Sequence, residues 1–231
     1  ALAEQYLKDH GMLDKTGHLF ITVGDGEMAE GPIQEALAEA TELGLKDVTL
    51  IVNFNRQTLA PRRADGSRNR IYAQLRSGGF DIQEIQELKY GSKLEKFLSE
   101  TPAGADLRRY LDQLTEPQWQ RFLRLTGQEI RDLLKAEVPA IEESIKHHLL
   151  DDKLKDILTD LAGHDLPFLI AKFREARQKG KRTAFIVWTI KGKGLGPLEA
   201  APGNHSAVLN KRQMEDLQAR FGIIPGREWD G

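Results

Sequence analysis

Two oxygen-bearing side chains have a spacing that can support chemistry. Asp25 lies within a Gly24-Asp25-Gly26 turn, and Asn55 follows in Asn53-Phe-Asn55. A carboxylate and a carboxamide that converge suit a hard cation such as Mg²⁺, which prefers oxygen ligands and commonly shares them with phosphates. The sequence therefore predicts a divalent-cation site, provided that the fold brings these two residues together.

The elements around the two residues predict that convergence. Residues 18–24 and 47–53 have the apolar pattern of buried strands, and residues 32–45 have that of a helix. The helix would carry the chain back roughly 21 Å. The second strand would return it roughly 23 Å. Because the displacements nearly cancel, both residues are expected at the carboxyl edge of a parallel sheet, where ligands bind in open α/β folds.

Composition excludes several classes of function. The chain has 231 residues, 40% hydrophobic and 29% charged, with a net charge of −2. Such a balance is ordinary for a globular protein and gives no general attraction to nucleic acid or anionic membrane. The absence of cysteine excludes disulfides, thiol catalysis and zinc–thiolate sites, and it suits a reducing, cytoplasmic compartment. No membrane span or signal peptide is expected. The absence of an initiator methionine suggests a piece of a longer protein.

The remaining pattern predicts one α/β domain over residues 1–231, with a doubly wound, mostly parallel sheet and helices on both faces. A helical insertion is expected over residues 92–160, with helices at 92–99, 105–113, 116–135 and 139–160. Further helices are expected at 1–10, 72–75, 165–179 and 210–221, strands at 79–85 and 183–190, and a basic loop at 56–70.

The Gly24-Asp25-Gly26 turn has two other interpretations. It could be a plain strand-to-helix turn, where glycine adopts positive φ at little cost. Gly24-x-Gly26-x-x-Ala29 also fits the looser dinucleotide fingerprint. Against the second interpretation, Asp25 would repel a pyrophosphate unless a cation lies between them. The second strand also ends in Asn53 and Asn55, where NAD binding requires an acid.

With Asn55 and Gln57, the turn resembles the thiamine-diphosphate motif of the transketolase superfamily. Residues 24–31 together with 53–57 resemble the homodimeric type of pyruvate dehydrogenase E1 component. Further matching runs are Tyr90-Gly-Ser92, Gly163-His-Asp165, residues 189–194 and Asn204-His205. The resemblance spans most of residues 1–220, is weakest in the basic loop and between about 100 and 160, and implies the thiamine-diphosphate-binding fold.

The resemblance implies a role for each matching residue. Asp25 and Asn55 would bind Mg²⁺ through their side chains, and Gln57 would add its backbone carbonyl. The residues that it places around thiamine diphosphate are Gly24, Asp25, Gly26, Glu27, Asn53, Asn55 and Lys191. Among them, backbone N–H groups of Gly26 and Glu27 would approach the diphosphate at a helix start. Lys191 would supply a second cation.

The resemblance also implies an activity. The enzyme would decarboxylate a 2-oxo acid such as pyruvate and pass the acyl group to a lipoyl-bearing acyltransferase, with His205 as the catalytic loop histidine. It implies a homodimer through the sheet domains, with no nucleic-acid or membrane partner. The glutamate that activates the cofactor in this family comes from a second domain with no counterpart here, so the isolated chain is expected to be inactive.

Two other functions stay open from the sequence: transketolase-type transfer of two-carbon units between sugar phosphates, and a non-enzymatic nucleotide-binding module.

Several conspicuous residues have structural interpretations. Asp165 is expected to cap a helix, and Trp119 to lie in the core. A solvated loop is expected to hold Arg62, Arg63, Arg68 and Arg70.

Overall fold

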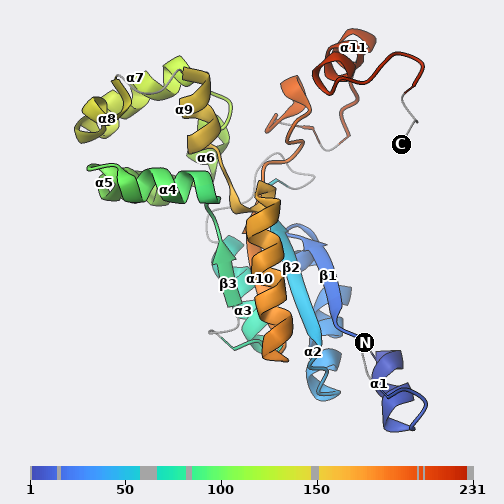
Figure 1. Ribbon diagram of the computed structural model, residues 1–231. Helices are drawn as coiled ribbons and strands as arrows, with labels where there is room; N and C mark the ends of the chain where they lie inside the picture. Colours follow the sequence, from blue (N-terminus) through green and yellow to red (C-terminus); the bar gives the residue numbers. More distant parts are fainter. Residues whose placement is uncertain are drawn as a thin grey trace.

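The computed structural model describes residues 2–14, 17–57, 67–81, 85–146, 151–201, 203–204 and 206–227. Within them, β1 (Leu19–Gly24), β2 (Val48–Phe54), β4 (Thr183–Trp188) and β3 (Ile85–Leu88) form one sheet in that spatial order. Every neighbouring pair is parallel. The strands therefore end at one edge, and the predicted α/β fold is confirmed (Figure 1).

Helices cover both faces of the sheet, as predicted. α2 (Gly31–Glu42) and α3 (Ser67–Ser77) lie on one face, and α10 (Leu166–Lys179) lies on the other (Figure 1). Side chains alternate between the two layers, as the pleat of a strand requires. Leu50 and Val52 of β2 join the core beneath α2 and α3, whereas Ile51 between them packs beneath α10.

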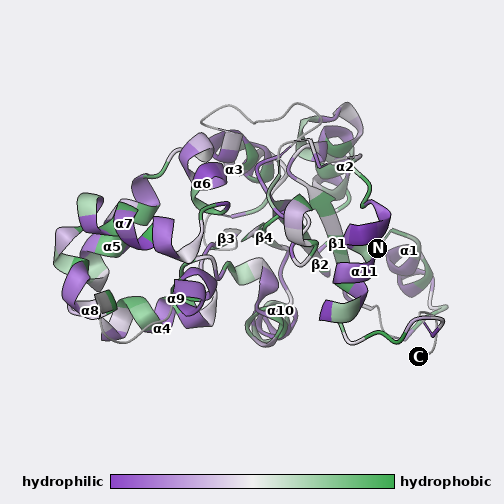
Figure 2. Cartoon of the chain, turned by 90° about the horizontal axis from the view of Figure 1, so that it is seen from above, coloured by the Kyte–Doolittle hydropathy of each residue, from purple (hydrophilic) through white to green (hydrophobic). Residues whose placement is uncertain are grey.

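The helical insertion follows β3 and lies beyond the carboxyl edge of the sheet (Figure 1). Its α-helices are α4 (Ser92–Glu100), α5 (Gly104–Gln113), α6 (Glu116–Phe122), α7 (Gly127–Glu137), α8 (Glu142–Lys146) and α9 (Asp151–Leu158). Viewed from above, they form a ring to one side of the sheet (Figure 2). Trp119 of α6 lies 6.3 Å from Trp188 of β4 between ring centroids. The insertion and the sheet therefore share one core.

Two predicted helices of the insertion are interrupted. The expected helix 116–135 divides into α6 and α7, because Thr126 begins a new helix with a capping box. Its backbone N–H donates to the Glu129 carboxylate over 2.8 Å, and its hydroxyl accepts from the Glu129 N–H over 3.2 Å. The expected helix 139–160 is likewise replaced by a 3₁₀ turn, Pro139–Ile141, followed by α8 and α9.

Predictions for residues 56–85 need a larger correction. α3 begins at Ser67, so Arg68 and Arg70 lie in a helix and not in a loop. Arg62 and Arg63 lie outside the described residues. The expected strand 79–85 is wrong for its first three residues, because Gly79 has φ 76° and terminates α3, and residues 79–81 are not in a strand. Residues 82–84 lie outside the described residues, and β3 is Ile85–Leu88. Left-handed backbone after the last helical turn is a common helix ending.

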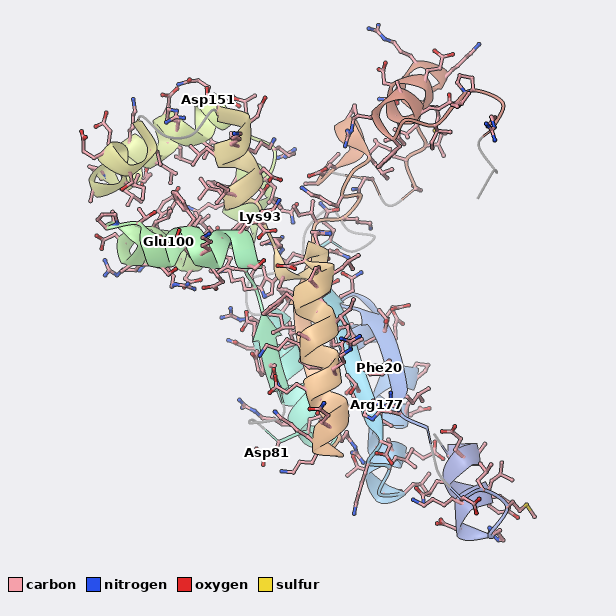
Figure 3. All side chains as sticks on the ribbon, viewed as in Figure 1. Phe20, Asp81, Lys93, Glu100, Asp151 and Arg177 are labelled. Carbon is pink, nitrogen blue, oxygen red and sulfur yellow. The ribbon has the colours of Figure 1, made fainter. Side chains whose placement is uncertain are left out.

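Both ends of the chain form helices near the predicted positions, α1 (Leu2–Asp9) and α11 (Lys211–Arg220). α1 lies at the amino end of the sheet, and α11 extends beyond its carboxyl end, opposite the insertion (Figure 1). Phe20 of the outer strand β1 is 42% exposed, near Arg177 of α10 (Figure 3). Within the described part of the chain, none of the helices has the length and apolar composition that crossing a bilayer requires.

The start of α7 depends on a glycine. A Cβ added at Gly127 would lie 2.0 Å from the backbone oxygen of Asp151 at the start of α9. Gly127→Ala should therefore lower the free energy of unfolding by about 1–3 kcal/mol through overpacking. Gly31→Ala is the matched control because no heavy atom lies within 4 Å of its added Cβ. Urea unfolding of both variants measures the difference, and equal stabilities would contradict the close approach of α7 and α9.

Candidate functional site

The carboxyl edge of the sheet brings Asp25 next to the loop that holds Asn55. β1 and β2 are in register, with Gly24 opposite Asn53. The Asp25 N–H donates to the Asn53 carbonyl over 3.1 Å. The Asp25 side chain is buried, and its Oδ2 accepts the backbone N–H of Arg56 over 2.8 Å. The carboxylate therefore contacts the residue that directly follows Asn55.

The loop after β2 is shaped by its own polar side chains. Asn55 Oδ1 accepts the backbone N–H of Gln57 over 2.9 Å. Arg56, between them, has φ 64°, which is left-handed and uncommon for a residue other than glycine. Asp25 and Asn55 thus hold two successive backbone amides at one sharp turn.

These groups fit a hard divalent cation. The donors are a carboxylate, a carboxamide and backbone carbonyls, all of which suit Mg²⁺. Each side-chain oxygen that accepts one amide N–H has a further lone pair. Within the described residues, no group of three or more histidine, cysteine or acidic side chains could hold a metal ion. One carboxylate leaves a net positive charge on a divalent cation, which an anionic ligand such as a diphosphate would balance.

The turn after β1 is held by the Glu27 side chain. Gly26 has φ −65°, and Gly24 belongs to the extended strand, so neither glycine is required here for a left-handed backbone. The Gly24 N–H instead donates to the Glu27 carboxylate, and a Cβ on Gly24 would lie 3.2 Å from Glu27 Oε2. Glu27 then opens a 3₁₀ helix, Glu27–Ala29. A Cβ at Gly24 would therefore require the end of the Glu27 side chain to shift by a few tenths of an ångström.

The end of β4 reaches the same edge. The Thr189 hydroxyl donates to Asn53 Oδ1 over 2.5 Å, and its N–H donates to the Phe54 carbonyl over 3.2 Å. Asn53 thereby links the ends of β1, β2 and β4. Lys191 follows two residues after Thr189, and its carbonyl accepts the Ala200 N–H over 2.9 Å. The edge position of Lys191 follows from the parallel β4; its contact with a phosphate stays a prediction.

His164 and Asp165 have structural roles. The Ile190 N–H donates to His164 Nε2 over 2.8 Å, which requires that this nitrogen carry no proton. Burial lowers the pKa of His164 below its ordinary 6.5, so the neutral ring is favoured. Asp165 caps α10 by accepting the Phe168 N–H over 3.1 Å, as predicted, and it also accepts the Ser92 N–H.

Three residues at the site were not predicted to be there: Arg56, Trp119 and Gln120. The Arg56 guanidinium carbon lies 4.7 Å from the Trp188 ring centroid and 5.5 Å from that of Trp119. The two rings thus enclose the guanidinium of a residue whose backbone is left-handed. Trp119 is buried, as predicted, yet its contact with Arg56 joins residues far apart in sequence, and no local pattern shows such a contact.

Gln120 contacts the same loop through its side chain. Its Nε2 donates to the Asn55 carbonyl over 3.4 Å, and its Oε1 accepts from Gln57 Nε2 over 2.9 Å. The site is therefore bounded by both the sheet and the insertion. His205, the predicted catalytic histidine, lies outside the described residues.

Comparisons with known proteins agree with the predicted resemblance. The pyruvate dehydrogenase E1 component of Escherichia coli (strain K12) is 26% identical over 227 residues, which cover 95% of this chain. That of Mycobacterium tuberculosis (strain ATCC 25618 / H37Rv) is 27% identical over 219 residues, or 92% of the chain. A 1-deoxy-D-xylulose-5-phosphate synthase of Pseudomonas fluorescens (strain Pf0-1) is 28% identical over 210 residues, or 90% of the chain.

The aligned region is a small part of each relative, covering 25%, 22% and 28% of their respective lengths. This chain thus spans about a quarter of the length of the curated relatives that it matches. No profile of a known protein family matches it. The resemblance to thiamine-diphosphate-dependent enzymes, predicted from the motif, is confirmed over most of the chain.

His164 predicts a pH dependence of stability. Because the pKa of His164 is lower in the folded than in the unfolded chain, its contribution to stability is complete above about pH 6.5 and is lost as the pH falls through the folded pKa. His164→Gln should therefore reduce the loss of unfolding free energy between about pH 7.5 and 5.5. Burial also lowers the pKa of His18, so part of the dependence will remain.

Chemical unfolding at the two pH values measures this effect. His10→Gln, at the exposed residue that follows α1, is the control and should keep the full pH dependence. An unchanged pH dependence in His164→Gln would contradict a neutral, partly buried His164.

Proposed function

We propose that this chain binds thiamine diphosphate through Mg²⁺ and forms the metal- and diphosphate-binding portion of a 2-oxo acid dehydrogenase E1 component. The observation that carries the proposal is a hydrogen bond: the backbone N–H of Arg56, the residue after Asn55, donates to the buried Asp25 carboxylate. It places a carboxylate and a carboxamide at the carboxyl edge of a parallel sheet, where ligands bind in such folds. The similarity to pyruvate dehydrogenase E1 components supports the same assignment.

Each residue of the site has a part in this proposal. Asp25, Asn55 and the Gln57 carbonyl hold the cation, and backbone N–H groups around Gly26 and Glu27 face the diphosphate. Asn53 keeps the strand ends in register through its bond to Thr189. When bound, thiamine diphosphate supplies the carbanion chemistry that attacks a 2-oxo acid and stabilises the product of CO₂ loss.

The finer assignments in the proposal are the substrate and the partners. Pyruvate is the proposed 2-oxo acid, a lipoyl-bearing acyltransferase is the proposed acceptor, and His205 is the proposed residue for acyl transfer. The functional enzyme is proposed to be a homodimer that acts in the cytoplasm. These assignments rest on the pyruvate dehydrogenase E1 similarity, together with the motif Asn204-His205.

A second candidate is another thiamine-diphosphate enzyme that acts on sugar phosphates. The similarity to a 1-deoxy-D-xylulose-5-phosphate synthase over 90% of the chain favours it. Both candidates require the same cation and diphosphate site. A non-enzymatic dinucleotide module has weaker support, because β2 is followed by Asn55 where NAD binding requires an acid.

Cofactor titration tests the proposal. Isothermal titration of the chain with thiamine diphosphate should show binding that depends on Mg²⁺. Asp25→Ala and Asn55→Ala should each weaken that binding at least about tenfold, because loss of even an outer-shell partner of a metal ligand costs that much. The exposed Asp132→Ala and Asn69→Ala are matched controls and should bind like the unmodified chain.

Thermal unfolding without ligand separates lost binding from lost folding in the Asp25 variant, whose carboxylate is buried. Equal affinity in both site variants and their controls would defeat the metal assignment. Stabilisation by NAD, without stabilisation by thiamine diphosphate and Mg²⁺, would favour the dinucleotide module.

A further inference from the structure

The loop that follows β2 is held from outside the sheet. α6 of the helical insertion contacts it through two consecutive residues, Trp119 against the Arg56 guanidinium and Gln120 against the Asn55 carbonyl. The insertion therefore contacts the backbone between the proposed metal ligands.

Gln120 and Gln57 form a buried pair of carboxamides. Both side chains are buried, and the Gln57 amide donates to Gln120 over 2.9 Å. A buried carboxamide that loses its partner is costly, so each residue restricts the orientation of the other. Because the Gln57 side chain is held by Gln120, the direction of the Gln57 backbone is restricted as well.

The C-terminal segment also contacts the Gln57 side chain. The Gln57 amide lies 3.5 Å from the Ala200 carbonyl. Arg56 and Ala200, with φ 64° and 53°, are the positive-φ residues other than glycine within the described part of the chain. Left-handed non-glycine backbone is maintained only where the surroundings impose it, and it gathers at functional sites. Both such residues lie beside Gln57.

We propose that Gln120, supported by Trp119, is a positioning residue that fixes the Asn55–Gln57 loop for the cation, so that the helical insertion controls metal affinity. This inference rests on the proposed function of the site. Gln120 acts through its bonds to Gln57 and to the Asn55 carbonyl, not by coordinating the cation. Its loss should therefore weaken Mg²⁺ binding while leaving the sheet folded.

The test uses Gln120→Met, Gln57→Met and the double variant in the full 231-residue chain. Methionine keeps most of the buried volume and removes the carboxamide. Gln128→Met is the matched control, since Gln128 lies on the exposed face of α7 and bonds Asp132 over 3.0 Å. Two quantities are measured: the Mg²⁺ dissociation constant at saturating thiamine diphosphate, and hydrogen exchange of the Arg56 and Gln57 amides without ligand.

Gln120→Met should raise the Mg²⁺ dissociation constant about three- to tenfold, the range for loss of a buried hydrogen bond. Gln57→Met should do the same, and the double variant should lose less than the sum of the two single changes, because both substitutions remove the shared Gln57–Gln120 hydrogen bond. Exchange of the Arg56 and Gln57 amides, which donate to Asp25 and Asn55, should accelerate in both single variants. The Gln128→Met control should change neither quantity.

Unchanged Mg²⁺ affinity, or unchanged exchange at Arg56 and Gln57, in a folded Gln120→Met chain would overturn the positioning role. Additive losses in the double variant would overturn it too. If Gln120→Met does not fold, Gln57→Met removes the same pair from the other side and decides the question. If the unmodified chain binds no cofactor while exchange accelerates in the variants, the proposed function fails and the support of the loop by Gln120 stands.

Discussion

The structure depends on one hydrogen bond, from the Arg56 backbone N–H to the buried Asp25 carboxylate. It joins the turn after β1 to the loop after β2, and it fixes where a negative charge lies at the edge of the sheet. Parallel pairing of β1 and β2 makes the bond possible, because Gly24 and Asn53 end level with each other. Without that register, Asp25 and Asn55 would not belong to one site.

Three parts of the chain contact the Asn55–Gln57 loop that contains this bond. The sheet contributes Asp25 and Asn55, the insertion contributes Trp119 and Gln120, and the C-terminal segment contributes Ala200. An insertion in an α/β sheet is often regarded as an addition to the surface. Here its core is continuous with that of the sheet, so a change in insertion packing reaches the loop at Asn55 directly.

The sequence was sufficient for the parts of the fold that local patterns determine. The strand–helix–strand crossover, α10 with its Asp165 cap, and the edge position of Asn55 all follow from periodicity and capping residues. The break between α6 and α7 at Thr126 also has a local signal, a threonine three residues before a glutamate. The apolar periodicity continues across that break and therefore predicted one helix. Contacts across long stretches of chain, such as Gln120 with Asn55, have no local signal and require the folded structure.

The most direct test of the account replaces Mg²⁺ with paramagnetic Mn²⁺ and follows the backbone amide signals of the chain by NMR. With thiamine diphosphate present, Mn²⁺ should broaden the amides of residues 24–27 and 53–57. It should leave those of α1, at the amino end of the sheet and away from the carboxyl edge, sharp (Figure 1). Broadening centred elsewhere, or none at residues 24–27 and 53–57, would contradict a cation held between Asp25 and Asn55.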